Sequence, residues 1–540
     1  MALREKWSVF CGKVRDFFAK PKVREALRIT TVVLTVAAFL AAVAISAYSI
    51  YAFAPLKAVV DLDAEMQTVS GFGASSAWIY QSLGKEGNGD AAGRAMEMLY
   101  GDSGLALNIF RYNIGGGSAD AALDGVWPYN DEEFDVNRRA ESFFVAENYS
   151  EPSDFFDESN YDFEGRDVAV QRLFAEALSK GNITKVVFFA NSPHYLMTES
   201  GLCIGKEEYQ NNLKPEFYEE FSAYLLITVN ALYEKHLKDL PVVPAVYISP
   251  ANEPQWKWGG KGASQEGCHY DAEVLAAFYA VFWDALNEFN AEHGTDFRLD
   301  AFESGCYEFH RNQEDISDYL AAMSKYGYFD SLGEISVHTY HAETSRSVRE
   351  KFAEFMDENY PDLNVTATEF CELKEGEFDT IKSGIFLAKT VLRDLTMIDA
   401  TEWSWWLSVA VGGYNDGLVY WDEEDERDED IWVLKRYYTF GQITRFVDEG
   451  DVRVDCGTSD PLGWAGLDVA VFKKPDGRVV VVVVNDSLAK NLRFDGLEEF
   501  AGTTVRVTAT TKEKNWAEST FVFEGSLPLE RKSVTTFVFG

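Results

Sequence analysis

Short apolar runs alternate with longer amphipathic stretches through most of the chain. Each run ends in polar, glycine or aromatic residues, as buried strands that open onto loops do. Apolar residues spaced three or four apart predict helices between the runs, as over residues 167–180, 215–236 and 272–292. Eight strand–helix units in series indicate the α/β class and a closed parallel (β/α)8 TIM barrel over residues 66–446. Its predicted strands are residues 69–78, 107–116, 185–197, 244–254, 297–304, 334–341, 364–373 and 400–409.

After residue 446 the pattern changes to short β-branched or aromatic runs joined by Gly, Asp and Pro. The turn Pro475-Asp476-Gly477 between two such runs indicates a hairpin. This pattern predicts an antiparallel β-sandwich over residues 447–540, to which residues 58–68 add a strand before the barrel begins. The predicted strands of the later part are residues 469–473, 479–485, 503–511, 519–523 and 533–539.

The amino-terminal segment differs from both domains. Residues 29–56 contain no charged residue, and a helix of that length would extend about 42 Å, enough to cross a bilayer. Residues 1–28 carry eight Lys or Arg (4, 6, 13, 15, 20, 22, 24, 28) against three acids (5, 16, 25). Because positive flanks stay in the cytoplasm, we expect a transmembrane anchor with residues 1–28 inside and everything after Lys57 outside. A signal sequence cleaved near Ala52-Phe53-Ala54 is the alternative, and it exports the same domains.

Composition narrows the class of partner. The 88 Asp and Glu outnumber the 49 Lys and Arg, and the net charge of −39 argues against nucleic acid as a partner. The six cysteines show no CxxC spacing and no His/Cys cluster, so no metal or cofactor is expected. Cys203 and Cys268 fall in loops on what could be one barrel face, which leaves a disulfide open. We interpret the acidic run 422–430 as a solvated loop, with calcium binding as the lesser alternative.

Ligand contacts in such a barrel come from the carboxyl ends of the strands. Two carboxylates stand out there, Glu253 on the fourth strand and Glu369 on the seventh. Cleavage of a glycosidic bond needs a proton donor for the leaving oxygen and a carboxylate for the cationic centre, which such a pair supplies. The other polar or aromatic residues at predicted strand ends are Ser75, Ser76, Trp78, Arg111, Tyr112, Asn113, Asn191, Ser192, Asn252, Glu303, Ser304, His338, Thr339, Tyr340 and Trp403 to Trp406.

The surroundings of the two acids suggest separate roles. Trp256 and Trp258 follow Glu253 closely, and an aromatic, partly dry environment favours the protonated carboxyl. Glu369 has to stay ionised in order to act as a nucleophile. The candidate sources of hydrogen bonds or positive charge near it are Arg111, His338 and Tyr340.

Three further motifs were weighed. In Trp403-Ser404-Trp405-Trp406, alternation points Trp403 and Trp405 to one face and Trp406 to the other, so that one face could form a sugar platform while the other packs on a helix. Gly115-Gly116-Gly117 lacks the Lys-Ser/Thr of a phosphate loop and is interpreted as a turn. No Gly-x-Ser-x-Gly elbow supports a serine hydrolase.

Longer motifs match one family in their order along the chain. They are residues 71–75 (GFGAS), 111–117 (RYNIGGG), 191–193 (NSP), 249–256 (SPANEPQW), 265–268 (QEGC), 337–340 (VHTY), 368–371 (TEFC) and 533–537 (SVTTF). On these motifs residues 58–540 resemble glycoside hydrolase family 30 of clan A, which joins a (β/α)8 barrel to a side β-sandwich. The segment 71–74 departs from the pattern, since many relatives carry another Gly there.

The resemblance implies a retaining double displacement with Glu253 as general acid/base and Glu369 as nucleophile, and it implies that Asn252 meets the sugar's 2-hydroxyl. The candidate substrate-binding residues are Trp78, Arg111, Asn113, Asn191, Asn252, Trp256, His338, Tyr340, Trp403 and Trp405. The NEPQW and QEG segments are most similar to the endo-β-1,6-galactanases of the family. β-1,6-Glucan, glucuronoxylan, glucosylceramide and β-xylosides or β-fucosides, on which other members act, stay open as substrates.

We therefore expect an extracellular retaining β-glycoside hydrolase that is anchored in the membrane and acts on a β-linked glycan without a cofactor. The oligomeric state is left open. Two other classes are kept: a glycan-binding surface protein on an inactive barrel, and a transglycosylase that forms the same covalent intermediate. Both carboxylates are present, which argues against the first of these.

Overall fold

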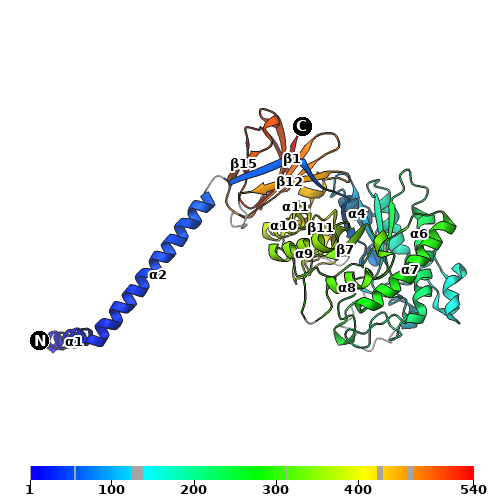
Figure 1. Cartoon of the computed structure of the whole chain (residues 1–540), viewed down its shortest axis with the longest axis horizontal. Helices are drawn as coiled ribbons and strands as arrows, with labels where there is room; N and C mark the ends of the chain where they lie inside the picture. Colours follow the sequence, from blue (N-terminus) through cyan, green and yellow to red (C-terminus); the bar gives the residue numbers. More distant parts are fainter. Residues whose placement is uncertain (1, 54–55, 124–137, 312, 423–429, 460–465) are drawn as a thin grey trace. The chain divides into compact units, whose positions relative to one another are not determined.

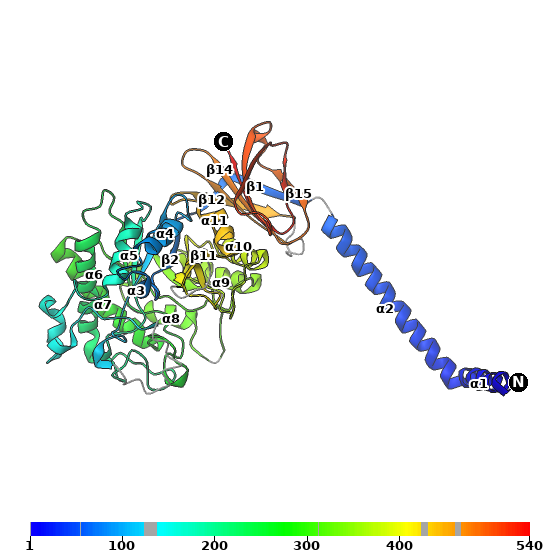
Figure 2. The same ribbon diagram turned by 180° about the vertical axis from the view of Figure 1, so that it is seen from behind.

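The computed structural model describes residues 2–53, 56–123, 138–311, 313–422, 430–459 and 466–540, which form two compact units (Figures 1 and 2). The amino-terminal unit consists of the helices α1 (Ala2–Ala19) and α2 (Pro21–Phe53). Within α2 the candidate span Pro21–Ser46 contains an 18-residue window with a mean hydropathy of 2.3, and the span is long and apolar enough to cross a membrane by length and composition. The predicted apolar helix is thus present, although it begins at Pro21 rather than at residue 29.

The barrel strands within the described chain are β2 (Gly71–Ser75), β3 (Ile109–Ile114), β4 (Lys185–Ala190), β5 (Ala245–Ser249), β6 (Arg298–Leu299), β7 (Glu334–His338), β8 (Asn364–Glu369) and β9 (Glu402–Ala410). They pair in parallel from β2 to β6 and from β7 to β9, and β9 also pairs with β2. A parallel bridge between Ser304 and Val337 joins the β6 and β7 sides, so the ring closes. All eight predicted strands are confirmed, and most are shorter than the apolar runs that predicted them.

Helices cover the outside of this barrel (Figures 1 and 2). Apolar side chains of α7, including Leu275, Phe278, Phe282 and Leu286, are buried at three- and four-residue spacing, which is why this face packs inward. The three helices expected from that spacing are confirmed as α5, α6 and α7. The barrel helices are α3 (Tyr80–Leu83), α4 (Gly89–Tyr100), α5 (Val168–Leu178), α6 (Tyr218–His236), α7 (Ala272–His293), α8 (Ile316–Met323), α9 (Arg346–Asn359), α10 (Ile381–Met397) and α11 (Lys435–Thr444).

Two short strands extend the barrel sheet beyond β9. The strand β10 (Gly417–Trp421) runs parallel to β9, and β11 (Ile431–Val433) pairs antiparallel with β10. The sequence prediction did not include them. Most of the acidic run 422–430 lies between these strands and outside the described residues, so its interpretation as a solvated loop stays a prediction.

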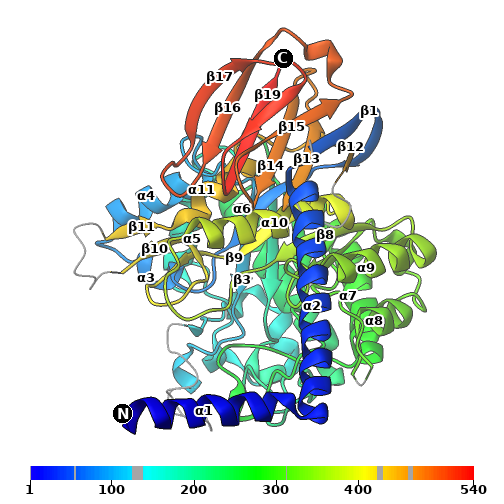
Figure 3. The ribbon, with the colours of Figure 1, turned by 90° about the vertical axis from the view of Figure 1, so that its left-hand side faces the viewer.

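The β-rich domain contains β1 (Leu56–Thr68), β12 (Val452–Thr458), β13 (Leu467–Lys473), β14 (Val479–Asn485), β15 (Lys490–Asp495), β16 (Thr504–Thr510), β17 (Ala517–Val522), β18 (Ser526–Leu529) and β19 (Ser533–Phe539). These strands share one continuous hydrogen-bonded order, β17-β16-β19-β14-β13-β12-β1-β15-β18, part of which Figure 3 shows side by side. β1 pairs antiparallel with β12, which confirms that residues 58–68 join this domain. The predicted strands are confirmed, whereas β12, β15 and β18 were missed.

The β-rich domain packs on the part of the barrel that α10 and α11 cover. Arg393 of α10 donates to both carboxylate oxygens of Asp468 in β13, at 2.7 and 3.2 Å, and both side chains are buried. The Trp516 indole donates to the carbonyl of Tyr438 in α11 at 2.8 Å. A buried bidentate pair has a fixed geometry, so these contacts attach the domain firmly to the barrel.

Candidate active site

Two carboxylates meet at the carboxyl ends of barrel strands, as the sequence predicts. Glu369 is the last residue of β8, and Glu253 lies four residues after β5. One carboxylate oxygen of each and one ring nitrogen of His338 all lie within 4.8 Å of one another. Glu253 has a φ of +50°, and its N–H donates to the Glu303 carbonyl at 2.9 Å. A non-glycine residue in this region needs such support, so the surrounding structure fixes where Glu253 sits.

His338, the last residue of β7, lies among three carboxylates. Its Nδ1 is 2.9 Å from Glu253 Oε1 and 3.6 Å from Glu369 Oε1, and its Nε2 is 2.8 Å from Glu303 Oε2. Because the Glu303 carboxylate only accepts, Nε2 has to carry a hydrogen, and the acids around the ring favour the imidazolium form of His338. Burial lowers the pKa of His338, but the attraction of the three carboxylates outweighs burial and raises it to about 10. The same three groups have the spacing of a metal site, and His338 would have to lose a proton in order to bind an ion there.

Arg111 of β3 is the second cation of the cluster. Its Nη1 donates to Glu369 Oε2 at 3.1 Å, its Nη2 donates to Glu303 Oε2, and its guanidinium lies 4.5 Å above the centre of the Phe189 ring. Glu303 is completely buried, which by itself raises the pKa of its carboxyl. The charges of Arg111 and His338 outweigh burial and lower that pKa to about 2, so Glu303 is a permanent carboxylate.

The cluster therefore holds three acids and two cations. With Glu303 ionised, a single proton shared between Glu253 and Glu369 makes it neutral. Burial raises the pKa of Glu369 to about 7, against the opposing charges of His338 and Arg111. Tyr340 also donates to Glu369, at 3.1 Å, whereas the Glu253 carboxyl is bonded only to His338 among the described residues. The donors Arg111 and Tyr340 thus favour the negative charge on Glu369.

The three predicted asparagines lie at neighbouring strand ends. Asn191 Nδ2 donates to Asn113 Oδ1 at 3.0 Å, and Asn252 directly precedes Glu253. The Oδ1 atoms of Asn191 and Asn252 are buried and have no hydrogen-bond partner within the described part of the chain. Buried polar atoms without a partner are rare, so these two oxygens are candidates for accepting hydrogen bonds from a ligand.

Aromatic side chains flank the charged cluster. Trp78 packs edge-on against Trp406 of β9, with ring centres 5.3 Å apart. Trp406 in turn packs against Phe189, the ring above which Arg111 lies. Trp256 is half-buried and follows Glu253 by three residues. The structure therefore brings Trp78 close to the cluster, together with Trp406, which the sequence prediction had not included.

Trp403 and Trp405 lie elsewhere, contrary to the prediction that they bind substrate. Both are buried almost completely. The Trp403 indole donates to Asp394 of α10 at 2.9 Å, and the Trp405 indole donates to the carbonyl of Asp416 at 2.5 Å. These contacts place both rings between the barrel and the elements outside it, where they pack the fold rather than the site.

The directions of the β9 side chains explain why the prediction for Trp403 and Trp405 was wrong. Glu402 of β9 bonds to Lys185 of β4 at 2.6 Å, and only side chains inside the barrel can meet in this way. Side chains alternate along a strand, so Trp406 points inward with Glu402, and Trp403 points outward. The predicted alternation of this segment was right, but the wrong face was assigned to the sugar.

The comparison with known proteins identifies the family. The model of O-glycosyl hydrolase family 30 matches residues 55–420. The chain belongs to O-glycosyl hydrolase family 30. This family 30 chain is therefore an O-glycosyl hydrolase, and the resemblance inferred from the motifs is confirmed.

The chain is similar to several proteins whose names state an activity. It is 23% identical over 465 residues to the endo-β-1,6-galactanase of Hypocrea rufa, covering 84% of this chain and 86% of that protein. It is 27% identical over 264 residues to the exo-β-1,6-galactobiohydrolase of Bifidobacterium longum subsp. longum, covering 40% of this chain and 16% of that protein. The catalytic domain of family 30 xylanase C from Talaromyces cellulolyticus has the same fold, with a TM-score of 0.66, 17% identity, and 90% and 100% of the two chains covered.

In the family 30 enzyme the carboxylate of Glu266 binds the glycine-rich turn at residues 115–117. The sequence prediction had given this acid no role. Glu266 accepts from the Gly116 N–H at 2.9 Å and from the Ser118 N–H at 3.0 Å. The interpretation of residues 115–117 as a turn is therefore confirmed. Cys203 and Cys268 are both free thiols, so the disulfide left open by the sequence does not form. The Cys268 thiol instead lies 3.6 Å from the His269 carbonyl.

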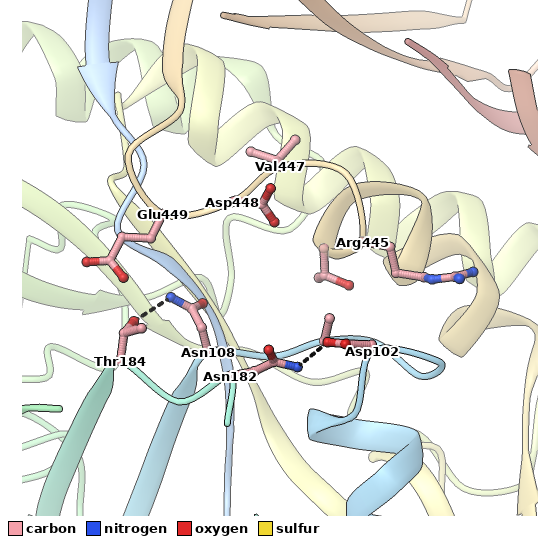
Figure 4. A pocket seen from close by; sticks show the side chains of 10 residues that line it. Asp102, Asn108, Asn182, Thr184, Arg445, Val447, Asp448 and Glu449 are labelled. Atoms are coloured by element: carbon pink, nitrogen blue, oxygen red, sulfur yellow. Dashed lines mark hydrogen bonds between the residues drawn. The ribbon is translucent and has the colours of Figure 1, made fainter. Parts of the chain in front are cut away.

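A separate cavity of about 360 Å³ lies at the opposite end of the barrel, where β3 and β4 begin (Figure 4). In it Asn108 donates to Thr184 at 2.9 Å, and Asn182 donates to Asp102 at 2.9 Å. Ligands of such barrels bind at the carboxyl ends of the strands, so this cavity is distinct from the cluster around Glu253.

Proposed function

We propose that this family 30 enzyme is a retaining β-glycosidase in which Glu253 is the general acid/base and Glu369 is the nucleophile. The observation that carries the proposal is the short separation of the two carboxyl groups, whose nearest oxygens lie within 4.8 Å. Retaining glycosidases hold these groups about 5–5.5 Å apart, whereas inverting enzymes need about 6.5–9.5 Å to admit a water. The separation supports direct attack by a carboxylate.

The donors around the acids support the division of roles. Arg111 and Tyr340 both donate to Glu369, which orients a carboxylate for attack on the anomeric carbon. As the bond to the leaving oxygen breaks, Glu253 gives its proton to that oxygen. In the second step Glu253 takes a proton from water, the water oxygen attacks the anomeric carbon, and the bond to Glu369 breaks.

The sugar next to the cleaved bond is expected to contact the buried amides and the aromatic side chains. Asn252 is assigned to the 2-hydroxyl, and its unpaired Oδ1 next to Glu253 supports this. Asn113 and Asn191 supply further hydrogen bonds. Trp78 and Trp256 supply apolar surface for the sugar ring.

Replacement of the two acids tests their roles. Glu369→Gly should lower turnover at least about a thousandfold, and azide should restore product as a glycosyl azide of inverted configuration. Glu253→Ala should instead give a glycosyl azide of retained configuration, because azide then attacks the intermediate without needing a base. If Glu369→Gly kept full activity, or if azide gave the same configuration with both variants, the assignment would be wrong.

The proposed substrate is a β-1,6-linked galactan that is cleaved internally. The relative from Hypocrea rufa supports this, since it carries the name endo-β-1,6-galactanase and is matched over 86% of its length. Incubation of the full chain with β-1,6-galactan, β-1,6-glucan, glucuronoxylan and glucosylceramide tests the proposal. A series of galactose oligomers from galactan alone is the expected product. Release of products only from another of these glycans would contradict the substrate and leave the hydrolase intact.

We also propose that α2 anchors the enzyme with its catalytic unit outside the cell. The candidate span in α2, whose uncharged part begins at Ile29, and the basic residues that precede Ile29 support this orientation. The intact mass of the protein recovered from cells, together with extraction of the membranes at alkaline pH, tests it. A soluble chain that begins near residue 55 would show a cleaved signal sequence instead of an anchor.

A further inference from the structure

Helix α1 carries an apolar stripe. Its members follow each other at three- and four-residue spacing, so they share one face of the helix. The side chains of Trp7, Phe10 and Phe17 are 67%, 56% and 52% exposed, so other described residues leave most of their surface uncovered. Large contiguous apolar surfaces mark sites where another apolar phase binds. The stripe consists of Trp7, Phe10, Cys11, Val14, Phe17 and Phe18.

The charged residues of α1 are ordered around this stripe. At about 100° per residue, the stripe spans about 120° between Phe17 and Cys11. Lys13 and Arg15 lie about 40° beyond its two edges, and Asp16 lies on the opposite side of the helix. Cations at the edges of an apolar face can lay their stems on apolar surface while their charges stay at polar headgroups. An acid at the centre of the polar face points to water.

The position of α1 in the chain identifies what this face meets. The helix ends at Ala19, and α2, with its candidate span Pro21–Ser46, begins two residues later. Residues 1–28 carry a net charge of 8 − 3 = +5 within a chain of net charge −39. The cytoplasmic surface of a membrane is negative because of its anionic lipids. An anionic lipid membrane therefore offers an apolar phase for the stripe and negative charge for the basic residues 1–28. It is also the surface next to which the candidate span in α2 would place α1.

We propose that α1 is an interfacial helix that lies along an anionic phospholipid surface, with its apolar stripe among the acyl chains. The inference rests on the proposed anchor, since α1 is absent from a chain whose amino-terminal segment has been cleaved. It adds a second, composition-dependent membrane contact to the one that α2 makes. The enzyme would then be held in membranes, or regions of membranes, that are rich in anionic lipid.

Hydrogen exchange on the full-length chain tests this proposal. The protein is placed in nanodiscs of phosphatidylcholine, or of phosphatidylcholine with one third phosphatidylglycerol, and exchange is followed by mass spectrometry over residues 7–19. A short helix is marginal in water, so contact with lipid should slow its exchange. We expect exchange at least about tenfold slower in the anionic discs, with no difference over the catalytic unit. Equal exchange in both kinds of disc would overturn the inference.

Adjacent residues provide a matched pair of variants. Phe10→Glu puts a charge into the stripe and should abolish the slowing, whereas Val9→Glu makes the same change of charge on the polar face and should largely retain it. If both variants lost the slowing equally, charge alone would account for it and the apolar contact would be refuted. Hydrolysis of galactan by the same discs should be equal for both variants. Loss of hydrolysis in every sample would count against the proposed function and leave the lipid result unaffected.

Discussion

Glu303 accepts hydrogen bonds from both cations of the active site, and its replacement by Gln removes a charge while keeping the size of the side chain. In the native cluster its Oε2 bonds to Arg111 and to His338 Nε2. The loss of this negative charge makes every remaining proton easier to lose. The pKa of His338 should fall because its positive form loses an attractive charge, and the pKa of Glu369 should fall because its negative form loses a repulsive one.

The size of the effect follows from the hydrogen bonds. A hydrogen bond to a charged partner contributes about 1.5–3 kcal/mol, and about 1.4 kcal/mol corresponds to one pH unit. The pKa of His338, about 10 in the native enzyme, should therefore drop by about one to two units in Glu303→Gln. The acidic limb of the pH profile should move toward acid by about one unit or more, because Glu369 loses the repulsion of Glu303.

The assay is kcat/KM for β-1,6-galactan oligosaccharides between pH 4 and 10, since this parameter reports ionisations of the free enzyme. Glu303→Asp is the control, because it keeps the charge and shortens the side chain. It should lower the rate through altered geometry while its profile stays close to that of the native enzyme. An unshifted profile in Glu303→Gln, with native thermal stability, would refute the electrostatic role of Glu303.

Three further predictions concern a donor to Glu369, the tryptophans of β9, and the buried acid Glu266. Tyr340→Phe removes one donor to Glu369 and should lower kcat about tenfold to a hundredfold in steady-state kinetics, with KM little changed. Trp406→Ala should raise KM for galactan oligosaccharides without unfolding the protein, whereas Trp403→Phe should leave KM unchanged and lower the free energy of unfolding in urea by about 1–3 kcal/mol. Burial raises the pKa of Glu266 from 4.5 to about 7, so the folded state disfavours its ionised form, and the native protein should lose stability relative to Glu266→Gln as pH rises from 4.5 through 7 in urea titrations.

The fold was largely predictable because most barrel strands are buried on both faces. Runs such as 185–190, with every residue buried in β4, have no competing interpretation once eight of them occur in series. β15 alternates buried and exposed positions over six residues and contains charged side chains, so its apolar signal is weak. β10 and β11 were missed for a related reason, since they are short and flank an acidic run. Sequence reasoning works here where buried runs recur in series, and it fails for short strands and for strands that contain charged or exposed positions.

The meeting of Glu253 and Glu369 was predictable for a different reason, which is that acids at the carboxyl ends of barrel strands share one barrel mouth. The direction of the tryptophan side chains was not predictable, because alternation separates two faces of a strand without showing which face lies inside the barrel. The ion pair between Glu402 and Lys185 across the barrel shows which face points inward, and only the structure reveals that pair. Glu303 was also predicted at a strand end, but nothing in its neighbourhood along the chain shows that Arg111 and His338 converge on it.

The charge count of the cluster explains why a third acid is needed. The proposed retaining mechanism requires one protonated and one ionised carboxyl side by side, whereas burial favours only the neutral form of a carboxyl and nearby cations favour only the ionised form. Arg111 and His338 supply two positive charges, and Glu303 permanently neutralises one of them. One positive charge is then left beside Glu253 and Glu369. A single negative charge on these two acids balances it. Arg111 and Tyr340 both donate to Glu369, so the negative charge is stabilised there, which agrees with the nucleophile role proposed for that residue.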